Sequence, residues 1–133
     1  MAETALSDVP LFAGLSEESL ALVAAGGVTD VPAGQVLAQA GDPGFGMFVV
    51  LEGAVVVERG ELHLDIERGG FFGELALLVP GSTRIARVRA KTDAQVLALT
   101  RVTFDQLLET EPSFARAMLR EMAVRLVQAR TGH

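Results

Sequence analysis

The sequence predicts a mainly β protein with flanking helices: a β jelly-roll (double-stranded β-helix-like) barrel with an N-terminal helix and two C-terminal helices. Three observations predict this class. Seven short β-prone runs, separated by glycine-rich turns, fill the middle of the chain. The segments before residue 26 and after Thr100 instead place apolar residues at helical spacing. Many short strands at such intervals are typical of a jelly roll or barrel.

The chain is predicted to form one domain over residues 1–133. Its 133 residues suffice for a single hydrophobic core, and no repeat, linker or low-complexity tract divides them. The expected organisation is an N-terminal helical segment over 7–25, a β-roll over 26–100 and C-terminal helices over 101–130.

The N-terminal segment is predicted to be helical. Ser16 can cap a helix whose first turn holds Glu17 and Glu18, where carboxylates meet the positive end of the helix dipole. Upstream, residues 10–15 carry an apolar patch, which must therefore pack on another element.

The β-roll is predicted from the short runs and the turns between them. Within the fifth run, His63 points opposite to Leu62 and Leu64 because side chains alternate along a strand, and it is interpreted as a surface residue. The runs cover residues 28–31, 36–40, 47–51, 54–57, 62–66, 85–90 and 96–99.

The C-terminal region is predicted to hold two helices. Residues 102–110 form the first, and Pro112 separates it from the second, an amphipathic helix of about 25 Å over 114–130. This apolar stripe could cover the barrel, a ligand or a second subunit. It comprises Phe114, Met118, Met122 and Leu126 at four-residue intervals.

Composition excludes several classes of site. The chain has no cysteine and only two histidines, so it offers no disulfide, no thiolate zinc site and no multi-histidine metal site. No lysine or arginine precedes Arg59, which disfavours a charged signal peptide, and the apolar runs are far shorter than the roughly 20 residues that span a bilayer. We expect a soluble, cytoplasmic protein without membrane insertion.

The charge distribution favours a small anionic ligand. The net charge is −6, which argues against a nucleic-acid surface. Residues 1–58 hold eight acids and no lysine or arginine, whereas residues 84–91 hold four cations and no acid. One local basic window in an acidic protein suits a small anion better than a polyanion. Within it, Arg87 and Arg89 are interpreted as the solvated face of a strand.

A candidate phosphate site follows from Gly73, Glu74 and Arg84. Gly73 allows close backbone approach, and residues 74–78 can form one helical turn whose free amides bind phosphate. Arg84 supplies a planar guanidinium for paired hydrogen bonds, while Glu74 would accept from sugar hydroxyls. The combination fits a ribose phosphate. The alternative is a structural ion pair between Glu74 and Arg84.

These same residues carry a family resemblance. Phe72-Gly-Glu-Leu-Ala-Leu77, followed by Arg84-Ile-Ala-Arg-Val-Arg-Ala90, resembles the phosphate-binding cassette of the cyclic-nucleotide-binding domain family. That family includes the bacterial catabolite activator protein, the regulatory subunits of protein kinase A and nucleotide-gated channels. Residues 9–15, 32–34, 41–42 and 49–53 resemble further family segments in the expected order.

The resemblance implies a ligand-binding set of Gly73, Glu74, Leu75, Ala76, Arg84, Ile85 and Ala86. Gly73 and Glu74 match the positions that hold the ribose 2′-hydroxyl. Leu75 and Ala76 match the turn that offers backbone amides to the cyclic phosphate.

Arg84 matches the arginine that neutralises the phosphate, and Ala86 matches the residue whose backbone amide also binds it. Ile85 departs from the family pattern of serine, threonine or alanine. Because threonine there favours guanine in the family, isoleucine makes a cGMP preference less expected. The favoured ligand is cAMP, with cGMP second.

The predicted function is a regulatory sensor in which cyclic-nucleotide binding moves the C-terminal helices about a hinge near Glu111 and Pro112. No catalytic residue, metal or cofactor is expected. Arg125 and Arg130 could contact the purine, but are interpreted as solvated helix residues.

The alternative is a ligand-free interaction module of the same fold. It would form a homodimer, or bind an effector protein, through the Met118–Met122–Leu126 stripe. A cupin-like oxygenase is disfavoured because the histidines for a metal triad are missing.

Overall fold

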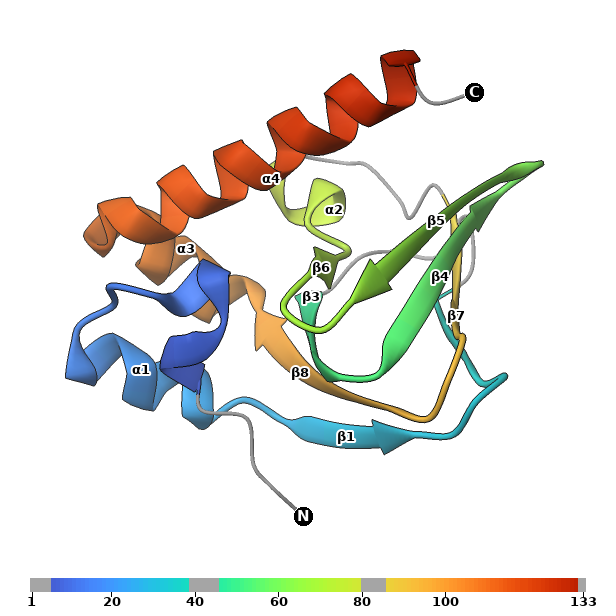
Figure 1. The fold of residues 1–133 in the computed structure, drawn as a ribbon. Helices are drawn as coiled ribbons and strands as arrows, with labels where there is room; N and C mark the ends of the chain where they lie inside the picture. The colour runs from blue at the N-terminus through green and yellow to red at the C-terminus, as the bar shows by residue number, and fades with distance from the viewer. Residues whose placement is uncertain (1–5, 39–45, 80–85, 132–133) are drawn as a thin grey trace.

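The computed structural model describes residues 6–38, 46–79 and 86–131. Two four-stranded antiparallel sheets form the roll, helices gather at one end of it, and the long last helix crosses above it (Figure 1). This arrangement confirms the predicted jelly roll with flanking helices.

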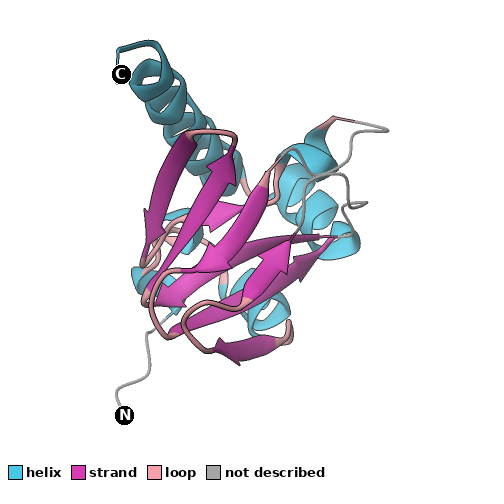
Figure 2. Ribbon diagram, turned by 90° about the vertical axis from the view of Figure 1, so that its right-hand side faces the viewer, coloured by secondary structure: helices cyan, strands magenta, loops and turns pink. Residues whose placement is uncertain are grey.

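The strands form two sheets, and Figure 2 shows them after a 90° turn from the view of Figure 1. The first has the order β1-β8-β3-β6, and the second has the order β2-β7-β4-β5. In the first sheet the bounds are Val28–Val31, Ala94–Thr100, Gly46–Glu52 and Phe71–Phe72. In the second they are Val36–Ala38, Arg87–Ala90, Ala54–Arg59 and Leu62–Glu67.

The strand β6 is absent from the sequence prediction. It is only two residues long, too short to show the alternation that reveals a strand. It pairs with β3, where Phe72 stacks on Phe48 with ring centroids 5.2 Å apart. The position of β6 matters because the candidate site begins immediately after it.

The turn between β3 and β4 requires glycine at position 53. Gly53 has φ +77°, and a Cβ atom there would lie 2.2 Å from the carbonyl oxygen of Asp93. Both the backbone conformation and the close approach of a second chain segment therefore exclude a side chain.

Two hydrophobic clusters stabilise the fold. The first joins the helices to the first sheet and contains Phe12, Phe104 and Phe114, which are fully buried. The second lies between the sheets and contains Val55 and Val96 among its members. The helical end and the roll thus share a continuous contact with β3 and β8, which contribute to both clusters.

The N-terminal region forms three short helices instead of the single helical segment expected over 7–25. They are η1 (Leu6–Asp8), η2 (Pro10–Phe12) and α1 (Glu17–Ala24). Gly14, with φ +86°, breaks the helical path. The predicted cap is confirmed, because the Ser16 hydroxyl accepts a hydrogen bond from the Ser19 amide at 3.1 Å. Leu11, Phe12 and Leu15 of the predicted apolar patch are buried, whereas Pro10 is exposed.

The remaining helices are α2 (Leu75–Leu78), α3 (Arg101–Thr110) and α4 (Pro112–Thr131). The predicted stripe on α4 is only partly right: Met118 is buried, but Leu126 is 60% exposed. Each four-residue step turns a helix by about 400°, so the stripe drifts by about 40° a step and reaches solvent by its end. Among the described residues, no helix meets the length and apolarity needed to cross a membrane.

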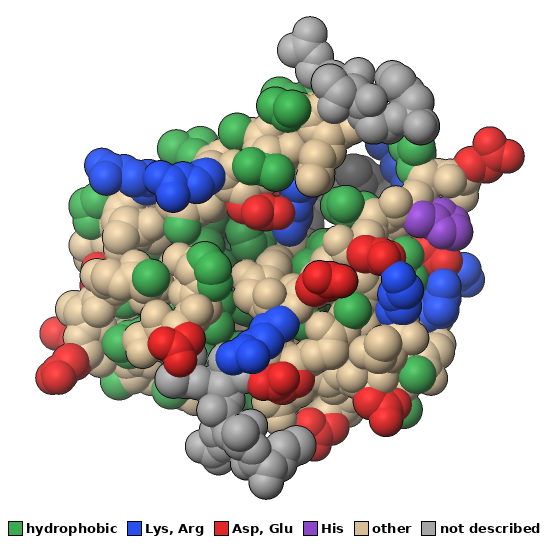
Figure 3. All heavy atoms as spheres, in the orientation of Figure 1, with side chains coloured by type: hydrophobic (Ala, Val, Ile, Leu, Met, Phe, Trp, Pro, Cys, Tyr) green, Lys and Arg blue, Asp and Glu red, His purple; other side chains and the backbone are tan. Residues whose placement is uncertain are grey.

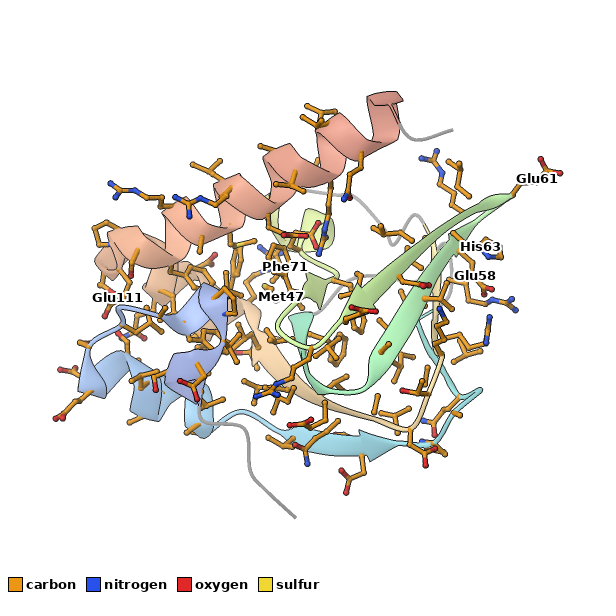
Figure 4. All side chains as sticks on the ribbon, viewed as in Figure 1. Met47, Glu58, Glu61, His63, Phe71 and Glu111 are labelled. Atoms are coloured by element: carbon orange, nitrogen blue, oxygen red, sulfur yellow. The ribbon has the colours of Figure 1, made fainter. Side chains whose placement is uncertain are left out.

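The outer face of the second sheet carries the solvated arginines that the sequence predicts. Arg87 and Arg89 form ion pairs with Glu58 at 2.8 and 2.9 Å. Hydrogen bonds from Arg89 and Arg87 lower the pKa of Glu58 from its ordinary 4.5 to about 2. His63 lies opposite Glu58 in the neighbouring strand and is exposed (Figure 4), which confirms its surface interpretation.

Candidate functional site

The site begins with a sharp turn between β6 and α2. Gly73 has φ +90°, a conformation that side-chain-bearing residues rarely adopt. Glu74 follows, and its carbonyl accepts hydrogen bonds from the amides of Leu77 and Leu78, both at 3.0 Å. The predicted helical turn is therefore present as α2.

Glu74 is a buried carboxylate. Its side chain is 8% exposed, and its Oε1 atom lies 3.6 Å from Nη1 of Arg125 on α4. Burying a charge without a partner is costly, so this contact helps to explain why an acidic residue is tolerated here. The ion pair links the turn after β6 to the last helix.

Arg125 joins three further groups at this point. It donates a hydrogen bond to the carbonyl oxygen of Phe71, and its guanidinium carbon lies 4.6 Å from the centroid of the Phe71 ring. Its Nε atom donates to Glu121 at 3.0 Å, one turn earlier on α4. Figure 4 shows Phe71 beneath α4, where these contacts meet.

The interpretation of Arg125 as a solvated residue is wrong, because its side chain is only 17% exposed. The sequence does contain a signal for its position. Arg125 is seven residues after Met118 and three after Met122, a spacing that places all three on one helix face. Arg125 thus continues the inward face that Leu126 was expected to continue.

A groove of about 450 Å³ runs between α4 and β5 with the turn that follows it. Leu64, Ile66 and Phe71 contribute to one wall, and Val124, Arg125 and Gln128 contribute to the other. The space-filling view shows this face hollowed below α4, with charged side chains around the opening (Figure 3). Arg125 therefore borders the groove while it contacts Glu74.

Only some residues of the predicted ligand-binding set are among those that the structure describes. Leu75 and Ala76 are the first residues of α2, whose opening amides have no carbonyl partner within the helix. Ala86 is buried directly before β7. Arg84 and Ile85 lie outside the described residues.

Among the described side chains, no group of three or more His, Cys, Asp and Glu could hold a metal ion. The described groups at this site are one buried carboxylate, one largely buried guanidinium and the backbone amides of a helical turn. These groups accept from hydroxyls and donate to anions.

The sequence matches the cyclic nucleotide-binding domain family over residues 28–111. The chain belongs to this family. The match begins at β1 and ends at the elbow between α3 and α4, so it includes the whole roll and the turn that holds Gly73 and Glu74.

Relatives carry this domain within longer proteins. An NTE family protein of Mycobacterium tuberculosis is 36% identical over 132 residues, which are 97% of this chain and 22% of that protein. A cyclic nucleotide-gated potassium channel of Rhizobium etli is 37% identical over 111 residues, which are 83% of this chain and 31% of the channel. The chain thus spans less than a third of these relatives.

A solved structure confirms the fold of the cyclic nucleotide-binding domain. The cAMP-bound structure of PfPKA-R superposes with a TM-score of 0.79 at 25% sequence identity, covering 96% of this chain and 45% of that one. The coverage extends beyond the roll to nearly all of the chain, flanking helices included.

Proposed function

We propose that this cyclic nucleotide-binding domain is a regulatory sensor that binds cAMP in preference to cGMP and reports occupancy through α4. One observation supports the proposal above others: Glu74 is buried directly after the Gly73 turn, and its described ion-pair partner, Arg125, belongs to the helix that must respond.

The proposed ligand contacts divide between the sugar and the phosphate. Glu74 accepts from the ribose 2′-hydroxyl, because a carboxylate beside the phosphate would be repelled. The amides of Leu75 and Ala76 and the guanidinium of Arg84 bind the cyclic phosphate, and the backbone amide of Ala86 adds a further donor. No catalytic step is required of these groups.

The preference for cAMP rests on Ile85 and on one solved structure. Isoleucine cannot donate or accept the hydrogen bond that a threonine hydroxyl would offer to guanine. The name of the PfPKA-R structure gives cAMP as its bound ligand. We propose the same ligand for this chain.

Coupling to α4 follows from the shared use of Glu74. A ribose hydroxyl that donates to this carboxylate competes with, or reorients, the contact from Arg125. Occupancy and the position of α4 are therefore linked, and ligand shifts the population between two positions of the helix.

The exposed face of α4 favours a protein-binding role as the second candidate. Leu119, Leu126 and Val127 are 69%, 60% and 59% exposed. These residues replace the predicted Met118–Met122–Leu126 stripe as the surface for a homodimer or an effector protein. Sedimentation of the purified chain distinguishes a dimer from a monomer, whether or not nucleotide is bound.

A thermal melt tests the sensor proposal. At a hundredfold excess over Kd, a ligand that binds only the folded state stabilises it by about 2.7 kcal/mol, which raises the Tm by several degrees. We expect this rise with cAMP, a smaller rise with cGMP and none with 5′-AMP. An equal rise with 5′-AMP, or none with any nucleotide, would contradict the proposal.

A further inference from the structure

The junction between β8 and α3 contacts the candidate site through Arg101. This residue is the first of α3, and its Nη1 atom donates a hydrogen bond to the carbonyl oxygen of Leu77 at 3.2 Å. Leu77 belongs to α2, the turn whose opening amides form part of the site. A residue outside the predicted ligand-binding set therefore contacts the turn on which part of that set lies.

The helix α2 is too short to hold its shape by itself. It spans only Leu75–Leu78, and the amides of Leu77 and Leu78 both donate to the carbonyl of Glu74. A single helical turn is unfavourable in isolation, because several dihedral angles are fixed for each hydrogen bond gained. The position of α2 must therefore come from contacts with the rest of the domain.

Other segments contact this turn at both of its ends. At the start, the side chain of Glu74 pairs with Arg125. At the end, the side chain of Leu77 is 5% exposed and belongs to the cluster that joins the helices to the first sheet. The last carbonyls of a helix have no partner within it, and a cation there also meets the negative end of the helix dipole. Arg101 supplies both a donor and a positive charge at that end.

The backbone of Arg101 is held by the sheet and the core. It follows Thr100, which pairs with Gly46 of β3 and caps α3 by accepting a hydrogen bond from the Thr103 amide at 3.3 Å. The strand β8 is an inner strand of the first sheet, and Phe104 in the first turn of α3 is fully buried. The guanidinium therefore reaches α2 from a backbone that long-range contacts fix in place.

We infer that Arg101 is a positioning residue, which fixes the end of α2 so that the amides of Leu75 and Ala76 face the cyclic phosphate. Arg101 touches no ligand in this role, because it acts through the carbonyl of Leu77. Its effect on phosphate binding rests on the proposed function, whereas its support of α2 does not.

Hydrogen exchange at single amides of the ligand-free protein tests the support of α2. Arg101→Met keeps a long apolar stem and removes the donors. The amides of Leu77 and Leu78 should then exchange about three- to fivefold faster, as expected for the loss of one hydrogen bond from an exposed side chain. Arg101→Lys keeps a donor and should stay close to the wild-type rate. Unchanged exchange in Arg101→Met would overturn the inference.

Arg116→Met is the matched control for this experiment. Arg116 is exposed on α4, so the variant removes the same charge from a different helix. It should leave the amides of Leu77 and Leu78 at the wild-type rate. Acceleration as large as that in Arg101→Met would show that the lost charge is the cause, and that the contact with Leu77 is not.

The two phosphorothioate diastereomers of cAMP test the role in phosphate binding. Each has sulfur, a weaker hydrogen-bond acceptor, in place of one of the two exocyclic phosphate oxygens, so amides directed at one oxygen distinguish them. The wild type should therefore bind the two with different Kd values. In Arg101→Met, cAMP should bind about three- to fivefold more weakly and the ratio of the two Kd values should move toward one. Arg101→Lys should restore both.

The ratio separates positioning from a general loss of structure. A general loss would weaken both diastereomers by the same factor and leave the ratio as it was. An unchanged ratio in Arg101→Met, or equal Kd values in the wild type, would overturn the inference. If the wild type binds no cyclic nucleotide, the proposed function fails and the role in phosphate binding fails with it, while the exchange result still decides whether Arg101 supports α2.

Discussion

Arg125 and Glu74 form an ion pair of 3.6 Å between the last helix and the turn that follows β6. The two side chains are 17% and 8% exposed, so the contact is shielded from solvent and is stronger than a surface pair of the same length. Because Glu74 is also the proposed ribose acceptor, the proposed function makes ligand recognition and the position of α4 depend on the same carboxylate.

Replacing the proposed phosphate ligand should weaken binding strongly. Arg84→Ala is expected to cost roughly 2–3 kcal/mol, about 30- to 150-fold in Kd for cAMP, because a charge-assisted contact is lost. Arg87→Ala is the matched control, since Arg87 pairs with Glu58 on the outer face of the roll. Titration calorimetry measures both. Unchanged affinity in Arg84→Ala would remove this residue from the site.

The role of Glu74 in reading the sugar can be isolated with an analogue. Glu74→Gln should weaken cAMP more than 2′-deoxy-cAMP, because only the former donates a 2′-hydroxyl. Any loss caused by the altered contact with Arg125 affects both ligands alike and cancels in the ratio of their Kd values. Glu61→Gln at the tip of the β4–β5 hairpin (Figure 4) is the control. Equal losses for the two ligands would mean that Glu74 does not contact the ribose.

Ligand preference should respond to position 85. Ile85→Thr introduces a hydroxyl that can hydrogen-bond guanine, so the ratio of cGMP to cAMP affinity should rise. Ile85→Val is the control, because it shares the branched shape without the hydroxyl. Competition of both nucleotides against a fluorescent analogue gives the ratio directly. The same ratio in the threonine and valine variants would count against the proposed pocket.

The ion pairs of Glu58 predict a pH dependence of stability. Its pKa is about 2 in the folded protein and 4.5 ordinarily, so the stabilisation is fully present above about pH 4.5. It is lost as the pH falls from there through about 2. Urea unfolding of the wild type and of Glu58→Gln should therefore differ most near neutrality and converge in acid. A difference that stays constant down to about pH 2 would refute the assignment.

Alanine substitutions at Gly34 and Gly53 distinguish the cost of backbone strain from the cost of a steric clash. Gly34 and Gly53 both have positive φ, but a Cβ atom meets nothing within 4 Å at Gly34 and lies 2.2 Å from a carbonyl at Gly53. Gly34→Ala should cost about 1 kcal/mol of unfolding free energy, from strain alone. Gly53→Ala should cost about 2 kcal/mol more, because the turn must shift. Equal losses in urea unfolding would show that the turn accommodates a side chain.

Local patterns in the sequence predict most of the fold because strands and caps depend on neighbouring residues. The β-branched run in residues 54–57 and the Ser16 cap are examples. The strand β6 is not predicted, because its pairing with β3 is a long-range contact that leaves no local pattern in the sequence. The α2 turn is predicted because Gly73 and Glu74 carry both a conformational signal and a family motif.

The contacts of α4 show where sequence reasoning stops. An arginine in an amphipathic helix is usually solvated. The sequence does not reveal that the buried carboxylate of Glu74 lies next to Arg125. The drift of a four-residue repeat likewise moves Leu126 outward and Arg125 inward. Both outcomes depend on how α4 packs across the roll, which is a long-range contact that the local sequence pattern does not contain.

The central claim is that Glu74, Arg84 and the α2 amides hold a cyclic nucleotide within the roll. Isothermal titration of the purified chain, first stripped of any nucleotide carried through purification, tests it most directly. The account predicts one site per chain, saturable by cAMP and filled less tightly by cGMP. Absence of measurable heat and of competition for both nucleotides, in a chain whose melting shows that it is folded, would contradict it.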